Sequence, residues 1–260
     1  SVCEICGSET VRKKHCSTCG VVEDCSHEAQ TYRKSTIRIG AIFRNLLSKM
    51  KTRIYPDLIK GVRGTSNKDH TPEHLIKGIL RAKHDIAVNK DGTTRYDCSE
   101  SPITHFKPGE VGAEVERLLL MGYTHDIKGD ALIDPEQILE LKPQDIIVPC
   151  CPDSPDEAAD EILFRTTKFI DELLGTLYGL PGFYNLEEKK ELIGQYVVGL
   201  APHTSAGIVG RIAGFSKTQC FYAHPLYHAA MRRDCFTFDT FIPLKSKNGW
   251  SLNKIGDVVD

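Results

Sequence analysis

The stretch Ile138-Leu139-Glu140-Leu141-Lys142-Pro143-Gln144-Asp145-Ile146-Ile147-Val148 carries the clearest evidence about the fold. It contains two short apolar runs, 138–141 and 145–148, which are bounded by polar residues and typical of buried strands. Lys142-Pro143 between them predicts a turn, because proline fixes φ and has no N–H to donate to a sheet. We therefore expect two strands joined by this turn.

Helical patterns lie on both sides of these strands. The strongest covers 155–178, where Ser154 can cap the helix, Pro155 fits its first turn and Gly179 can end it. Because helices and strands mix without regular β-α-β alternation, the sequence predicts an α+β fold rather than a doubly wound sheet. The other predicted elements are helices over 39–50, 110–121 and 206–215, the last thinned by small residues for close packing, and a hairpin over 84–97 with its turn at Asp91-Gly92.

The composition is that of a soluble globular protein. The 260 residues are 40% hydrophobic and 26% charged, with a net charge of −2, so any basic binding surface has to be local. No apolar run is long enough to span a membrane. The ten cysteines are too sparse for a secreted disulfide scaffold, which favours a reducing, cytoplasmic compartment. Because the chain starts with Ser1 and shows no signal peptide, we expect it to be part of a longer chain.

Two C-x-x-C pairs near the start predict a zinc module over residues 1–28. Cys3, Cys6, Cys16 and Cys19 supply four thiolates, the set that a closed, structural, tetrahedral Zn²⁺ site prefers. Gly7 and Gly20 follow the two pairs and allow the backbone to turn around the metal. The alternatives are reduced cysteines or a redox C-x-x-C pair, and Cys25 or His27 could replace one ligand.

Several basic residues have the pattern expected of phosphate contacts. Lys60 and Arg63 are separated by glycine, which lets the backbone approach a phosphate; the alternative is a solvated turn. A second group on one predicted helix could follow a DNA backbone, although an ordinary exposed helix face would look the same. It comprises Lys77, Arg81, Lys83 and His84. The histidines 203, 224 and 228 fit either phosphate contacts or core positions, and Arg232-Arg233 is the better phosphate contact.

From about residue 55 to 234 the chain resembles the large subunit of the archaeal D-family DNA polymerases. The zinc pairs fit that family as well. The resemblance rests on DLIKGVRG (57–64), KGILRAKH (77–84), DGTTRYD (91–97), PITHFKP (102–108), GYTHD (122–126), GLAPHTSAG (199–207), YAHP (222–225) and HAAMRR (228–233).

The resemblance implies that residues 29–234 are part of a polymerase core built of double-psi β-barrels. It implies a DNA primer-template and deoxynucleoside triphosphates as substrates, and a heterodimer with a small subunit that carries a 3′–5′ exonuclease. A sliding clamp is a further partner. Lys60 would lie at the active site, with Arg63 in place of a second lysine. Beside what the resemblance implies, we expect His203, Arg232 and Arg233 to contact nucleic acid or phosphate.

In the family, Mg²⁺ is held by aspartates in an Asn-Cys-Asp-Gly-Asp run directly after the paired arginines. Here Asp234 stands in place of that Asn and no Asp-Gly-Asp follows. Instead, residues 235–260 resemble the start of a Hint-type intein, with Cys235 as the nucleophile. The alternatives are that Cys235 is an ordinary polymerase cysteine, or that the intein is naturally split.

The sequence therefore predicts a fragment of the polymerising subunit of a replicative DNA-directed DNA polymerase, inactive by itself. The rival interpretations are a zinc-containing nucleic-acid-binding module without catalysis and a barrel enzyme related to RNA polymerases.

Overall fold

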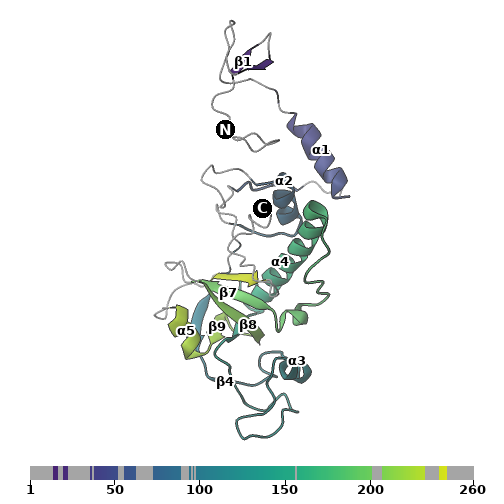
Figure 1. Ribbon diagram of the computed structural model, residues 1–260. Helices are drawn as coiled ribbons and strands as arrows, with labels where there is room; N and C mark the ends of the chain where they lie inside the picture. Colours follow the sequence, from purple (N-terminus) through teal and green to yellow (C-terminus); the bar gives the residue numbers. More distant parts are fainter. Residues whose placement is uncertain are drawn as a thin grey trace. The chain divides into compact units, whose positions relative to one another are not determined.

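The chain divides into two compact units, Ser1–Thr52 and Arg53–Asp260. Figure 1 shows the computed structural model. It describes residues 14–16, 20–22, 36, 38–51, 56–62, 73–88, 94, 96, 98–155, 157–200, 207–231 and 240–244. Within this part of the chain no helix is long and apolar enough to cross a membrane.

The first unit contains a small hairpin-like pair of strands and one helix. Strands β1 (Lys14–Cys16) and β2 (Gly20–Val22) are antiparallel, with Cys16 opposite Gly20. Helix α1 (Ile39–Lys49) confirms the helix predicted over 39–50. Leu46 and Leu47 are buried, whereas Ile39 at its start is exposed, so only the C-terminal half of the predicted apolar stripe is covered.

The second unit is organised by a six-stranded sheet with the order β10-β7-β8-β6-β9-β3. The pairs β6–β8 and β3–β9 are parallel, and the other three are antiparallel. A mixed sheet combined with helices agrees with the predicted α+β class. The strands are β3 (Ser99–Pro102), β6 (Asp145–Pro149), β7 (Tyr196–Leu200), β8 (Gly207–Ser216), β9 (Cys220–Ala223) and β10 (Thr240–Leu244).

Strand β6 lies inside this sheet and confirms the strand predicted at 145–148. All five of its residues are buried. Ile146 and Val148 belong to one hydrophobic cluster and Ile147 to the other. Because both faces are covered, residues 146–149 are all apolar instead of alternating with polar residues. The strand predicted at 138–141 is confirmed as β5 (Leu139–Glu140). It does not pair with β6 but with β4 (His105–Phe106), in a separate sheet.

Helix α4 (Ala159–Leu173) is the long helix predicted over 155–178, and Figure 1 shows it between the sheet and α2 (Leu75–Lys83). It continues as a π-helical turn, Leu174–Tyr178, and Gly179 ends it with φ 65°, as predicted. The predicted cap is wrong. Ala158 precedes the helix without a side-chain cap, and the hydroxyl of Ser154 instead accepts a hydrogen bond from Gln219 Nε2 at 2.8 Å.

The helix predicted over 206–215 is wrong, because this segment forms strand β8. β8 is hydrogen-bonded to β7 on one side and to β6 on the other. The small residues do serve close packing, but in a sheet: a Cβ on Gly214 would lie 2.6 Å from Val111. Pairing on both sides therefore outweighs a local pattern that resembled a helix.

Three further elements differ from or add to the prediction. The helix predicted over 110–121 is limited to α3 (Val115–Leu120), because turns occupy the residues before it. The first arm of the hairpin predicted over 84–97 forms no strand at residues 86–88, and its turn at Asp91-Gly92 lies outside the described residues. The 3-10 turn Lys189–Leu192 and helix α5 (Pro225–Met231) complete the unit.

Candidate active-site region

The segment that carries Lys60 packs against helix α2. A Cβ on Gly78 of this helix would lie 2.8 Å from Ile59 Cγ2, so the contact depends on glycine. The Lys60 ammonium donates a hydrogen bond to the Val88 carbonyl, and Arg81 Nη2 lies 3.5 Å from the Lys60 carbonyl. Two motifs that the sequence placed separately, around Lys60 and around Arg81, are therefore adjacent.

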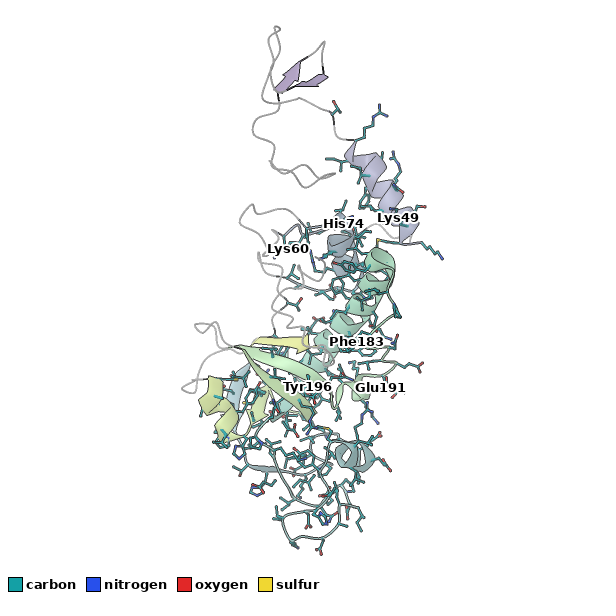
Figure 2. All side chains as sticks on the ribbon, viewed as in Figure 1. Lys49, Lys60, His74, Phe183, Glu191 and Tyr196 are labelled. Carbon is teal, nitrogen blue, oxygen red and sulfur yellow. The ribbon has the colours of Figure 1, made fainter. Side chains whose placement is uncertain are left out.

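Together they line a cavity of about 600 Å³. Lys60, labelled in Figure 2, and Arg81 contribute its cations, and Asp57 and Asp85 its carboxylates. The neutral lining comes from Pro56, Leu58, Gly78, Ala82, Ile86, Ala87 and Val88. The cavity lining therefore contains both positive and negative side chains, and its binding preference depends on which of these charges are already paired.

Arg81 is an internal residue of this region. Its side chain is 6% exposed, and Nη1 donates to Glu73 Oε2 at 2.9 Å in a two-pronged ion pair. Burial lowers the pKa of Arg81 to about 10, which still leaves it charged at neutral pH. Its Nε is buried without a partner in the described part of the chain. Lys77 is buried as well. An exposed helix face, the alternative considered above, is therefore wrong for these two residues.

Lys83 and His84 bind one carboxylate of helix α4. Lys83 Nζ donates to Glu172 Oε1 at 2.6 Å, and His84 Nε2 lies 2.7 Å from Glu172 Oε2. Burial by itself would raise the pKa of Glu172, but the bonds from Lys83 and His84 outweigh it and hold that pKa below its usual value. His84 also meets the Phe169 ring edge-on. These contacts fix α2, and with it the Lys60 cavity, on α4.

Among the described residues, Lys60 is the cation of the cavity lining that no carboxylate neutralises. Its bond to a carbonyl is a bond to a neutral acceptor. An anionic oxygen forms a stronger, charge-assisted bond with an ammonium group than a carbonyl oxygen does.

Of the remaining residues considered for the site, three lie in the described part of the chain and the others do not. His224 and His228 lie at helix α5. His224 Nδ1 accepts a hydrogen bond from the Leu226 amide at 3.1 Å, and His228 Nδ1 lies 2.9 Å from Glu100 Oε2. Cys16 ends strand β1. The others lie outside the described residues, namely Cys3, Cys6, Cys19, Arg63, His203, Arg232, Arg233 and Cys235.

Comparison with known proteins identifies the family. Residues 51–244 match the family described as "DNA polymerase II large subunit DP2, catalytic domain". The chain belongs to the DNA polymerase II large-subunit family. The match covers the Lys60 cavity, α2, α4, the sheet and α5, and it continues past Cys235 to Leu244.

Three relatives illustrate the similarity. The DNA polymerase II large subunit of Archaeoglobus fulgidus is 44% identical over 239 residues, which cover 90% of this chain and 20% of that protein. For Thermococcus kodakarensis the identity is 44% over 255 residues, 93% of this chain and 14% of the relative. The relative from Pyrococcus abyssi is 48% identical over 219 residues, which cover 84% of this chain and 14% of that protein. The chain thus spans 20% or less of the length of these relatives.

Sequence reasoning missed the acidic partners in this member of the DNA polymerase II large-subunit family. Glu73, Glu172 and Glu100 each bind a residue predicted or considered as a phosphate contact. Glu172 lies 89 positions from Lys83, so no local pattern could pair them. Gly78 offered a usable signal, because a glycine inside a helical pattern indicates close backbone approach.

Proposed function

We propose that the chain is part of the polymerising subunit of a replicative DNA-directed DNA polymerase. The complete enzyme would transfer deoxynucleotides from their triphosphates to a DNA primer, as directed by the template. The observation that carries this proposal is the match of residues 51–244 to the catalytic domain of the family. Because the chain covers 20% or less of its relatives' length, this fragment is proposed to be inactive alone.

Lys60 is proposed to contact the triphosphate or the primer phosphate. Phosphoryl transfer develops negative charge on equatorial oxygens, and a fixed ammonium stabilises that charge. In support, Lys60 has a neutral partner, Val88, and a backbone held by Gly78 and Arg81. Four further phosphate contacts are proposed from the sequence, at residues outside the described part of the chain: Arg63, His203, Arg232 and Arg233.

The basic residues of α2 divide into two roles. Lys83 and His84 are proposed to contact the DNA backbone while sharing the Glu172 carboxylate, since Lys83 keeps 34% of its side chain exposed. Lys77 and Arg81 are buried, which favours a supporting role for them under the Lys60 segment. This revises our prediction that all four residues contact DNA.

A structural Zn²⁺ is proposed for Cys3, Cys6, Cys16 and Cys19 in a module over residues 1–28. The backbone supports it at one point. β1 ends at Cys16 and the antiparallel β2 begins at Gly20, so the chain reverses direction around the second C-x-x-C pair. Such a reversal brings two thiolates onto one cation.

Mg²⁺ is proposed for the complete enzyme. Within the described residues no group of three His, Cys, Asp or Glu side chains is placed to hold a metal ion. The described residues therefore do not themselves form a magnesium site. Its carboxylates are proposed to follow the insert.

Residues 235–260 are proposed to begin an intein of the Hint fold. The Cys235 thiol would attack the Asp234 carbonyl and convert the amide into a thioester, with the freed α-amine on Cys235. The opposing interpretation is that Cys235 is an ordinary polymerase cysteine. It would account for the family match to residue 244 and for the pairing of β10 with β7. The sequence downstream of residue 260 distinguishes the two interpretations. The intein interpretation requires a terminal Asn there, followed by the Asp-Gly-Asp run of the polymerase.

The proposed assembly is a heterodimer with a small 3′–5′ exonuclease subunit, acting with a sliding clamp. The region 29–234 is proposed to contribute to a double-psi β-barrel core. These proposals rest on family membership, and the mixed sheet of the second unit is compatible with them.

The test is the substitution Lys60→Ala in the full-length subunit, assembled with its partner. We expect the single-turnover incorporation rate to fall at least about tenfold, as when one charge-stabilising group is removed. The control is Lys190→Ala, a lysine that is 67% exposed and paired with an exposed Glu114. Zinc content should not change in either variant. Wild-type incorporation by the Lys60 variant would remove this residue from the active site.

A further inference from the structure

Helix α5 is held in the second unit by three side chains that reach different elements. The Tyr227 hydroxyl donates to the carbonyl of Ile208 in β8 at 2.9 Å. His228 Nδ1 lies 2.9 Å from Glu100 Oε2 in β3. Met231 is 2% exposed and belongs to the core cluster around β6 and β8. Because β3 and β8 are separate strands of the sheet, these contacts fix both the position and the rotation of the helix.

The Glu100–His228 pair is the one of these three contacts that joins two ionisable side chains. The Glu100 side chain is 2% exposed and that of His228 11%. A buried carboxylate is costly unless it is paired, so Glu100 strongly favours one placement of the imidazole. The Phe221 ring meets the imidazole edge-on, with ring centroids 5.6 Å apart, and limits its rotation further.

The bond also determines which nitrogen of His228 carries a proton. Nδ1 faces a carboxylate and therefore donates. Nε2 is buried and has no hydrogen-bond partner within the described part of the chain. The connection to Glu100 is thus made through Nδ1 alone, which allows the two ring nitrogens to be tested separately.

Helix α5 ends at Met231, and Arg232 is the next residue. In the function proposed above, Arg232 and Arg233 contact phosphate, and the catalytic carboxylates follow them in the spliced chain. The contacts that fix α5 therefore also fix Met231, the last described residue before Arg232 in the sequence.

We propose that Glu100 and His228 are positioning residues for the polymerase reaction: they hold α5, the helix that directly precedes Arg232 and Arg233 in the sequence. This inference rests on the proposed polymerase function. Glu100 lies 128 positions from His228 in the sequence, and neither residue needs to touch substrate. Displacement of a reacting group by about 1 Å can cost about a hundredfold in rate.

The test uses three substitutions of His228 in the full-length, spliced subunit with its partner. His228→Leu removes both ring nitrogens, His228→Asn keeps a donor near the Nδ1 position, and His228→Gln puts its amide near the Nε2 position. We expect Leu and Gln to lower the maximal incorporation rate by about 10- to 100-fold. Asn should recover most of that loss. The KM for nucleotide should change less than about threefold in all three, as for an interaction needed only in the transition state.

A second readout follows the helix itself. Hydrogen exchange at the amides of 226–231 should accelerate in the Leu and Gln variants and return towards wild type in the Asn variant. Glu100→Leu should reproduce His228→Leu. Glu114→Leu, which removes the exposed partner of Lys190, is the matched control and should change neither readout.

The outcomes are distinguishable. Activity kept by Gln and lost by Asn would show that Nε2 acts directly, which overturns the positioning role. Wild-type rates in all His228 variants would overturn it too. If the wild-type complex extends no primer, the proposed function fails. The exchange pattern then still shows whether Glu100 fixes α5 through Nδ1.

Discussion

The buried side chain of Asp145, in β6, bonds to Arg211 in β8 and to Tyr123 after helix α3. Its carboxylate is 1% exposed and accepts bonds from Arg211 Nε and Nη2, both at 2.8 Å, and from the Tyr123 hydroxyl at 2.6 Å. Burial, followed by the charge of Asp145, raises the pKa of Tyr123 well above its usual value, so Tyr123 remains a donor. The hydrogen bonds that Arg211 donates to Asp145 raise the pKa of Arg211. All three groups are thereby satisfied.

We predict that Asp145→Ala destabilises the second unit by about 3 kcal/mol, because it leaves the Arg211 guanidinium largely buried without a counter-charge. Tyr123→Phe should cost about 1 kcal/mol, the net value of one hydrogen bond. Urea unfolding followed by circular dichroism would measure both. Glu114→Ala, at an exposed ion pair, is the control and should stay within about 0.5 kcal/mol. Equal stability of Asp145→Ala and wild type would refute the structural role.

Two glycines near Lys60 make a matched pair of substitutions. A Cβ on Gly78 would lie 2.8 Å from Ile59, whereas a Cβ on Gly61 would have no neighbour within 4 Å. We predict that Gly78→Ala pushes the Lys60 segment away from α2, costs about 1–3 kcal/mol and slows incorporation in the full complex. Gly61→Ala should affect stability by less than about 0.5 kcal/mol. The paired measurement is thermal unfolding together with single-turnover incorporation, and similar effects of the two substitutions would contradict the packing argument.

At the scale of elements, the docking of α2 on α4 depends on acidic groups. Glu172 receives Lys83 and His84, and Arg165 of α4 donates to Asp85 Oδ2 at 3.0 Å. The hydrogen bond that Arg165 donates to Glu157 raises the pKa of Arg165. The helices are therefore joined by charges that face each other across their contact.

This docking predicts a pH dependence. The pKa of Glu172 is lower in the folded chain than its usual value, so its contribution to stability is present above the unfolded pKa, about 4.3. It is lost as the pH falls through the folded pKa. We expect Glu172→Gln to reduce the slope of unfolding free energy against pH between about pH 5 and 3. Glu116→Gln, on α3, is the control. An unchanged slope in the Glu172 variant would show that the pair is not coupled to folding.

Prediction of single elements succeeded where the pattern was long and local. The 3.6-residue periodicity and Gly179 identified α4 and its end, and the apolar run at 145–148 identified β6. It failed for β8, where small residues were interpreted as helix packing. Strand β8 is held by hydrogen bonds to β6 and β7, which both lie outside residues 207–216. The sequence of 207–216 therefore carries no sign of this pairing.

At the scale of the whole molecule, the chain divides into Ser1–Thr52 and Arg53–Asp260, so we expect the proposed zinc module to unfold independently of the second unit. We predict that the chain purifies with about one zinc ion, as four thiolates require. A chelator should remove it and unfold residues 1–28, because a structural zinc site supplies the folding free energy of a small module. The melting of the second unit should not change.

The measurement is zinc analysis with differential scanning calorimetry, before and after chelation. Cys16→Ser is the matched variant, since it removes one proposed ligand without touching the second unit. Protein that contains no zinc when purified without chelator would end the proposal.

The sequence by itself determined the α+β class, the long helix, the buried strand and the family resemblance. Each of these depends on residue order within a short window or on motifs in a fixed order. Only the tertiary structure decided that 207–216 is a strand, that Arg81 is buried on Glu73, and that His228 is bound to Glu100. The reason is sequence separation: Asp145 and Arg211 lie 66 positions apart, and Glu100 and His228 lie 128 apart. Periodicity reports neighbours within a helical turn or a strand, whereas the partner of a buried charge is chosen by the packing of the whole chain.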